Sequence, residues 1–398
     1  MKELVDIARR YEELARSGAP AALATVIRAA GSTYRLPGAR MLIDAGGGVT
    51  GCVSGGCLER DVVEQAQRVL ATGEPRIVVY DTREDDEGDW SFGLGCKGRV
   101  DVLIEALRDE PANPVRFVEG CLRTRREGAI ATVVGVERAG GVRVGQRVLA
   151  NADGIAAASI ADASVAERCG GDLRAVLATG SMEATYAVST GGVEGRVEVV
   201  LERVRRPLQL VLFGCGHDAA PLARFAGELG WPVTVVDYRP RNLARARGLG
   251  GVTVVAARPG EFAGAVAFDD RTAAVVMNHN YADDRAVLET LLAAPLGYVG
   301  LLGPRARTAQ LMAEVRPASA SRALSPGCIH GPVGLDIGAA NPEEIAVSIV
   351  AEILAVFTGR EGGHASNRVA PLHTREGAVE GVPSGSVRGT SACGIAHG

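Results

Sequence analysis

The first half of the chain repeats one sequence pattern, and this repeat restricts the possible folds more than any other feature. The segment ATVIRAAGSTYRLPGARMLIDA, residues 24–45, aligns with ATVVGVERAGGVRVGQRVLANA, residues 131–152, at an offset of 107 residues. Further along, GRVDVLIE at 98–105 aligns with GRVEVVLE at 195–202, where the offset is 97 residues. Two copies of one pattern in a single chain predict two copies of one structural unit.

Both copies show the same succession of local signals. Apolar runs with a period of two residues, such as RIVVY, are typical of strands, and an amphipathic segment between them is typical of a helix. We therefore expect each copy to fold as three strands, a helix and two further strands. The predicted fold class is α/β, with an amino-terminal mixed α/β domain over 1–112 and a decayed second copy of that unit over 113–205.

From about Pro207 the pattern changes to alternating strands and amphipathic helices, which is typical of a Rossmann-like, doubly wound parallel sheet. We expect this domain to cover 206–357. Its last helix follows the sequence NPEE, in which Asn341 is predicted to be the N-cap and Glu344 to complete a capping box. Residues 358–398 lack periodicity and are expected to form a disordered tail. Strands are predicted at 208–213, 232–237, 252–255, 273–278 and 297–302.

Composition excludes several classes of protein. The net charge is −4 and no long basic run occurs, so a nucleic-acid partner is not expected. The first residues, MKELVDIARRYEELARSG, are charged throughout and predict an amphipathic helix rather than a signal peptide. No apolar stretch reaches the ~20 residues of a membrane span. The 8 cysteines are scattered rather than regularly spaced, which argues against a disulfide framework and favours a reducing, cytoplasmic setting.

The motif GCGHDA lies between a predicted strand and a predicted helix. Gly214 and Gly216 allow a tight turn and a close backbone approach to a pyrophosphate, which the N-terminus of the helix attracts. Asp237 ends the next strand, 21 residues after Gly216, where a carboxylate can bind ribose hydroxyls. Arg239 and Arg241 follow, and either could bind an additional phosphate. A Rossmann shell that holds no nucleotide is the alternative interpretation.

Histidines follow several of these strands. His217 lies in the Gly-rich turn, His279 follows the fourth strand with Asp284 behind it, and His330 precedes the last helix. The crevice of a doubly wound sheet lies beyond the carboxyl ends of its strands, so His217 and His279 are expected to face it. The spacing of these residues does not match a metal site, and none is predicted. Hydrogen bonding to an anionic ligand is the preferred interpretation, and an ordinary surface loop is the alternative for His330.

Comparison of the two copies separates scaffold from specialised sequence. Three features occur only in the first copy: the GSTYRLPG segment at 31–38, the SGGC step, and the acidic loop at 81–98 that carries Cys96. Residues 161–164, with the sequence ADAS, occupy the position of SGGC in the second copy. What only one copy contains is a candidate for function. The candidate residues of the SGGC step are Ser54, Gly55, Gly56 and Cys57.

Cys57 is predicted to lie at or near the start of a helix. The positive dipole there favours the thiolate, which attacks sulfur or binds a soft metal. The alternative is that Cys57 is a small buried apolar residue, as most free cysteines are. Comparison of the copies gives the functional interpretation equal weight, and Cys96 is a second, weaker candidate.

Several motifs, taken in order, resemble the xanthine dehydrogenase accessory protein family (XdhC/CoxI). GSTYRLPGARMLI, GCVSGGCLE and GLGCKGRVDVLIE are similar to its amino-terminal domain. FGCGHDAAPLARFAGELGWPVTVVDYRP, MNHNYADDRAVLETLL, YVGLLGPRARTAQL and IHGPVGLDIGAANPEEIAVSIVAEI are similar to its carboxy-terminal Rossmann domain. The similarity extends to about Phe357. One departure concerns Cys96, because Lys97 stands where the family usually has glycine.

The resemblance implies a maturation factor rather than an enzyme. Such proteins bind the molybdenum cofactor, either molybdopterin or its dinucleotide form, support its sulfuration by a cysteine desulfurase, and insert it into a molybdenum hydroxylase such as xanthine or carbon monoxide dehydrogenase. The alternative is an NAD(P)-dependent oxidoreductase that uses the same Gly-rich turn, with His279 and Asp284 as the candidate acid. A homodimer is a reasonable expectation for an α/β protein of this kind.

Overall fold

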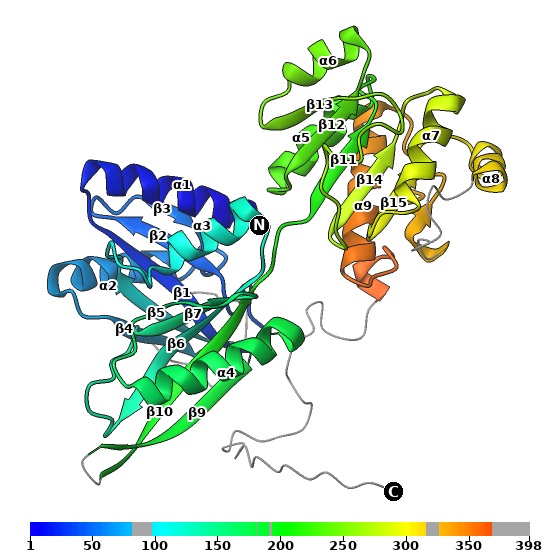
Figure 1. Ribbon diagram of the computed structural model, residues 1–398. Coiled ribbons are helices and arrows are strands. Elements are labelled where there is room, and N and C mark those ends of the chain that lie inside the picture. The colour runs from blue at the N-terminus through cyan, green and yellow to red at the C-terminus, as the bar shows by residue number, and fades with distance from the viewer. Residues whose placement is uncertain (82–97, 181, 191–192, 316–325, 368–398) are drawn as a thin grey trace, which may run out of the picture.

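The computed structural model describes residues 1–81, 98–180, 182–190, 193–315 and 326–367. The chain forms two lobes joined by a single passage of the backbone before β11 (Figure 1). The amino-terminal lobe holds both copies of the repeat, and the carboxy-terminal lobe holds the Rossmann sheet. Within the described residues, no helix combines the length and the apolar character that crossing a membrane requires.

The two copies fold into two five-stranded antiparallel sheets with the same strand order, β3-β2-β1-β5-β4 and β8-β7-β6-β10-β9. The first copy comprises α1 (Lys2–Ser17), β1 (Ala21–Gly31), β2 (Arg40–Asp44), β3 (Val49–Gly51), α2 (Glu59–Thr72), β4 (Arg76–Asp81) and β5 (Gly98–Ala106). The second comprises α3 (Pro114–Thr124), β6 (Gly128–Glu137), β7 (Arg147–Asn151), β8 (Gly154–Ala158), α4 (Ala163–Thr179), β9 (Met182–Thr190) and β10 (Val193–Val204).

Details of the pairing also repeat. The ladder between β1 and β5 is irregular at Ile27, and the ladder between β6 and β10 is irregular beside Val134, which is 107 residues later. Both residues are buried in one small cluster with Leu103. The two sheets therefore contact each other through equivalent residues, as the subunits of a two-fold symmetric dimer do.

Helices cover the remaining faces of both sheets in equivalent ways. One face of the first sheet packs on α2 and one face of the second packs on α4. On the other side, α1 buries Leu23 and Leu42, and α3 buries the equivalent Ile130 and Leu149. Figure 1 shows α1 and α3 side by side, with α2 and α4 on opposite outer surfaces.

Two buried ion pairs join the copies reciprocally. Arg40 of the first copy donates to both oxygens of Glu202 in the second, at 2.8 and 2.7 Å. Arg147, which is equivalent to Arg40, donates to both oxygens of Glu105 in the first copy, at 2.6 and 2.7 Å. Both arginine side chains are only 4% exposed. A charge this deeply buried requires its partner, so the two copies constrain each other's position.

The carboxy-terminal lobe is a six-stranded parallel sheet in the order β13-β12-β11-β14-β15-β16. Strands β11 and β14 are buried at every position, because helices cover both faces. The predicted fold class, including the duplication and the Rossmann-like sheet, is confirmed. The elements are β11 (Gln209–Phe213), α5 (Ala219–Glu228), β12 (Val233–Asp237), α6 (Pro240–Arg247), β13 (Val252–Ala256), β14 (Thr272–Val276), α7 (Tyr281–Leu291), β15 (Tyr298–Leu301), α8 (Arg305–Glu314), the 3-10 turn η1 (Pro326–Cys328), β16 (Ile329–His330), α9 (Pro342–Phe357) and the 3-10 turn η2 (Ala365–Asn367).

The start of α9 follows the predicted capping pattern with one addition. Asn341 is the N-cap and its side chain accepts from the Glu344 N–H at 2.9 Å. The Glu344 carboxylate interacts with the N–H of Asn341, as predicted, and also accepts from the N–H of Ala340 at 2.8 Å. The reciprocal bond of the capping box is thus shared between two adjacent N–H groups. The last part of the predicted tail, 368–398, lies outside the described residues.

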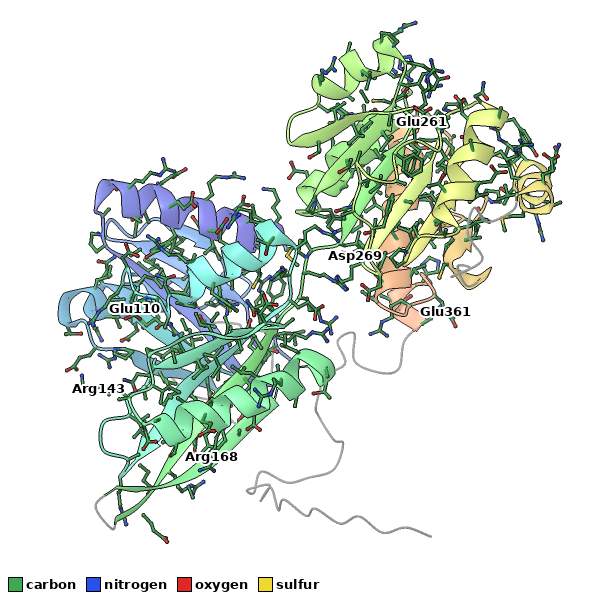
Figure 2. All side chains as sticks on the ribbon, in the orientation of Figure 1. Glu110, Arg143, Arg168, Glu261, Asp269 and Glu361 are labelled. Carbon is green, nitrogen blue, oxygen red and sulfur yellow. The ribbon has the colours of Figure 1, made fainter. Side chains whose placement is uncertain are left out.

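The lobes touch along the amino-terminal edge of the Rossmann sheet. Arg125, which follows α3, pairs with Asp269 before β14 at 3.0 Å. Gly230, which precedes β12, lies close against the start of α1, because a Cβ atom on it would be only 2.5 Å from the backbone nitrogen of Lys2. In Figure 2, Asp269 lies at the end of the carboxy-terminal lobe that faces the amino-terminal lobe, and Glu261, which follows β13, lies farther from the amino-terminal lobe. The carboxyl ends of the strands therefore point away from the amino-terminal lobe.

Candidate functional site

The loop that carries Cys57 is organised around the buried side chain of Ser54. Its hydroxyl oxygen accepts from the N–H groups of Gly56 at 3.1 Å and Leu58 at 3.2 Å, and lies 3.5 Å from the Cys57 sulfur. The same hydroxyl donates to the Glu59 carboxylate at 2.5 Å, which also accepts from the Ser54 N–H at 2.9 Å. Because one side chain ties together most of the loop, the exposed thiol is presented on an ordered turn.

Glu59 was not among the residues singled out from the sequence, although the structure gives it a central position. It is the first residue of α2, whose N-cap residue, Leu58, has an apolar side chain that cannot cap the helix. Burial opposes ionisation of Glu59, but the hydrogen bonds from Ser54 outweigh it and hold the pKa of this carboxyl below its ordinary value. In the sequence, Ser54 and Glu59 are separated by four residues, and this spacing alone does not predict a bond between them. The bond forms because the loop folds back on the first turn of α2.

Two segments specific to the first copy meet here. The exposed ring of Tyr34, from the GSTYRLPG segment, lies 3.5 Å from where a Cβ atom would stand on Gly55. A Cβ atom on Gly98 would lie 2.3 Å from the Ser32 carbonyl oxygen, but its equivalent Gly195 approaches the Arg138 carbonyl oxygen in the same way in the second copy. Residues 82–97 of the acidic loop, Cys96 included, lie outside the described residues.

Cys52 lies beside this loop with a different environment from Cys57. Burial raises the pKa of the Cys52 thiol, although the nearby Arg35 guanidinium opposes that shift. Arg35 is itself held by two 2.6 Å bonds to the Glu3 carboxylate. A thiol that is kept protonated is a poor nucleophile, so Cys52 is a poor candidate for the reactive group. The Cys57 side chain is the more exposed of the two.

The equivalent position in the second copy has an ordinary helix start. Asp162 is the N-cap of α4, and one of its carboxylate oxygens accepts from the N–H groups of Ser164 at 2.9 Å and Val165 at 3.1 Å. This is a common and stabilising cap. The first copy has replaced it by a loop with a glycine at φ 108°, Gly56, and a neighbouring thiol.

The Gly-rich turn lies at the switch point of the Rossmann sheet, between β11 and β14. Gly214 has φ 102°, and a Cβ atom there would lie 2.7 Å from the Met277 carbonyl oxygen, so no side chain fits. The His279 ring is 3.4 Å from where a Cβ atom would stand on Gly216, and its Nε2 is 3.4 Å from the Asp218 carboxylate. His217, in the same turn, is exposed. The predicted glycines and histidines are thus brought together.

Asp237 is buried and all of its bonding capacity is used within the protein. One oxygen accepts from the N–H groups of Tyr238 and Arg239 and from Arg239 Nε, at 2.8 to 2.9 Å. The other accepts from the Cys215 N–H, Arg239 Nη2 and Asn242, at 2.8 to 3.0 Å. Burial opposes ionisation, but these bonds, led by those from Arg239, hold the pKa of Asp237 below its ordinary value. In this conformation the carboxylate is saturated and cannot accept a ribose hydroxyl.

Two further predicted residues have internal partners. The Asp284 carboxylate accepts from the Asn278 N–H at 3.2 Å and from Arg307 at 2.5 Å, which fixes the loop after β14. The His330 ring stacks on Tyr298 with centroids 4.5 Å apart, on the other side of β15 from the switch point. Arg307 was not anticipated, because only the tertiary placement of α8 brings it to Asp284.

The two parts of the predicted site lie apart within one chain. The Gly-rich turn opens at the carboxyl edge of the Rossmann sheet, whereas the amino-terminal lobe contacts the amino edge. Strands of five residues separate these edges by roughly 16 Å. One described site is therefore the loop with the Cys57 thiol, and the other is the Gly-rich turn of the Rossmann sheet. Among the described residues, no three His, Cys, Asp or Glu side chains gather as metal ligands.

This combination defines a class of protein in which a nucleotide-type Rossmann lobe is joined to a duplicated α/β lobe that carries a thiol. Residues 14–81 match the XdhC and CoxI family, and residues 210–353 match the XdhC Rossmann domain. The chain belongs to the XdhC and CoxI family.

Relatives support this assignment over most of the chain. A Bacillus subtilis (strain 168) protein named as a probable xanthine dehydrogenase subunit is 31% identical over 337 residues, which are 84% of this chain and 92% of that protein. The molybdenum cofactor insertion chaperone PaoD of Escherichia coli (strain K12) is 31% identical over 122 residues, or 30% of this chain and 36% of its own length. A crystal structure described as a xanthine dehydrogenase from Bacillus halodurans superposes with a TM-score of 0.71 at 26% identity, covering 89% of this chain and 97% of that one.

Proposed function

We propose that this protein is an accessory factor that carries the molybdenum cofactor and inserts it into a molybdenum hydroxylase of the xanthine or carbon monoxide dehydrogenase type. The cofactor is its cargo rather than a resident group. We further propose that a cysteine desulfurase sulfurates the cofactor while it is held, and that the protein acts in the cytoplasm without turnover of its own.

The observation that carries the proposal is the contact of two first-copy segments, in which Tyr34 lies against Gly55 in the loop that exposes Cys57. The second copy builds the same sheet and helix without a thiol there, so folding does not require Ser54, Gly56 or Cys57. The sequence around Cys57 lies within the residues that match the XdhC and CoxI family. A relative of this chain is named a molybdenum cofactor insertion chaperone, which agrees with a carrier role.

The chemistry of the loop fits such cargo. A molybdenum centre with sulfur ligands suits a protein group of similar chemistry. A cysteine thiolate is such a group, because it can act as a soft metal ligand and as a nucleophile toward sulfur. Cys57 is exposed, and a Cβ atom on the neighbouring Gly56 would meet no described atom within 4 Å, so a ligand can approach the loop. Ser54 and Glu59 hold the loop in place and keep their own polar groups paired.

The test is to purify the protein from cells that make the cofactor and to measure bound molybdenum and oxidised pterin fluorescence together. We expect both near stoichiometry in the wild type and a loss of about tenfold or more in Cys57→Ser, which imitates the small polar residues of the second copy. Cys328→Ser, which changes a thiol in the other lobe, is the matched control and should retain both.

The outcomes separate the alternatives. Equal retention by Cys57→Ser would reject the role of this thiol while leaving the carrier function in place. Absence of molybdenum and pterin from the wild type would reject the carrier function and favour the NAD(P)-dependent alternative. Titration with NAD(H) and NADP(H), followed by the fluorescence of Trp231 near the start of β12, would then decide that question.

A further inference from the structure

The Arg239 side chain spans the carboxyl edge of the Rossmann sheet beside the Gly-rich turn. Its guanidinium bonds Asp237 at the end of β12 and also donates to the backbone and side-chain oxygens of Asn278, after β14, at 3.1 and 2.9 Å. Strand β11 lies between these two strands, so the guanidinium spans the carboxyl end of β11, where the Gly-rich turn begins. In a Rossmann fold the diphosphate of a dinucleotide meets the protein at this turn.

The hydrogen bonding of two polar groups beside Arg239 bears on how a ligand would bind here. The Asp237 carboxylate occupies the position of a ribose acceptor. It already accepts two hydrogen bonds from the Arg239 guanidinium and four from other donors, which leaves it no capacity for a ribose hydroxyl. Asn278 is 7% exposed, and its Nδ2 is buried without a hydrogen-bond partner among the described residues. A buried donor without a partner destabilises the folded state. Asn278, which anchors Arg239, therefore has incomplete hydrogen bonding in this conformation.

The charge around the turn suits an anion. Arg245 donates to the Cys215 carbonyl at 2.8 Å, and the guanidiniums of Arg239 and Arg258 both lie over the Tyr238 ring, at 5.4 and 5.5 Å from its centroid. The Asp283 carboxylate is farther from Arg239 than that of Asp237, at 4.0 Å. An arginine fork binds carboxylates and phosphates with the same geometry, so a phosphate can take the place of Asp237 as its partner.

We propose that Arg239 is an exchangeable latch over the Rossmann crevice. It holds Asp237 and Asn278 while the crevice is empty, and it transfers its fork to the diphosphate of a bound ribonucleotide. The released Asp237 carboxylate then accepts the ribose hydroxyls. The ligand class is a ribonucleoside diphosphate group, as a pterin dinucleotide contains, so this inference deepens the proposed function and rests on it.

The test uses the full-length protein and isothermal titration with inorganic pyrophosphate, ADP, CDP and the corresponding nucleosides. Pyrophosphate needs no ribose acceptor and therefore reports on the latch alone. Arg239→Met should lower its affinity by about tenfold or more, because a charge-assisted fork is lost. Asn278→Ala should raise it by about threefold to tenfold, because the closed latch loses one of its anchors. ADP against CDP distinguishes an adenine from a cytosine ligand.

Asn242→Ala is the matched control, since Asn242 bonds Asp237 rather than Arg239. It should leave pyrophosphate affinity within about twofold. Weaker binding in Asn278→Ala would show that Arg239 is a fixed strut and would overturn the latch, as would unchanged binding in Arg239→Met. Asn278→Ala keeps the test valid if Arg239→Met does not fold. The titration is independent of molybdenum retention, so failure of the latch and failure of the carrier function are distinguishable.

Discussion

The two copies of the amino-terminal unit have one fold but different helix starts. In the second copy, Asp162 caps α4 directly. In the first copy, a loop takes the place of this cap. The Ser54 hydroxyl donates to the carboxylate of Glu59, the first residue of α2, and the loop holds Cys57 at the surface. The sheet and its packing therefore tolerate change at this one position. A duplicated unit can therefore keep one copy as support while the other acquires chemistry.

The largest expected effect comes from the contacts that the copies share. Arg40→Met leaves Glu202 without its partner, and Arg147→Met does the same to Glu105. Each change should lower the free energy of unfolding by about 3–5 kcal/mol, measured by urea denaturation. The double variant Arg40→Met/Glu202→Met should recover most of the loss. A clear inequality between Arg40→Met and Arg147→Met would show that the two copies are not equally braced.

An intermediate effect is expected at the helix starts, where the copies differ. Asp162→Ala removes an ordinary cap and should cost about 1 kcal/mol. Ser54→Ala removes two acceptor bonds and a donor to Glu59, and should cost about 1–3 kcal/mol. Only Ser54→Ala should also reduce molybdenum retention. If Asp162→Ala reduced it equally, the assignment of function to the first copy alone would be wrong.

The smallest expected effect is a change in the free energy of unfolding at acid pH. Glu59 has a folded-state pKa below its ordinary value of 4.5, so its contribution to stability is present above that value and is lost as pH falls through the folded-state pKa. Unfolding free energies measured between pH 7 and pH 3 should fall less steeply at the acid end for Glu59→Gln than for the wild type. Parallel curves would mean that the loop bonds to Glu59 do not contribute to stability.

Local signals were enough to predict the elements. The predicted strand at 252–255 is observed at Val252–Ala256, and Asn341 caps the last helix as predicted, because periodicity and caps depend on neighbours along the chain. The 107-residue offset likewise predicted two copies, which the matching strand orders confirm. The Glu344 carboxylate bonds the Asn341 N–H, as the capping box predicts, and also the Ala340 N–H, since one carboxylate can reach two adjacent N–H groups.

Strands, helices, Gly-rich turns and the segments unique to one copy can all be recognised from the sequence. Their partners depend on the three-dimensional packing: Arg40 and Arg147 reach across to the opposite copy, and Glu59 folds back on Ser54. The same packing turns the carboxyl edge of the Rossmann sheet away from the amino-terminal lobe. The two kinds of information differ in range, because backbone periodicity depends on residues a few positions apart, whereas a buried carboxylate accepts from whichever donor the packing of distant elements brings within about 3 Å of it.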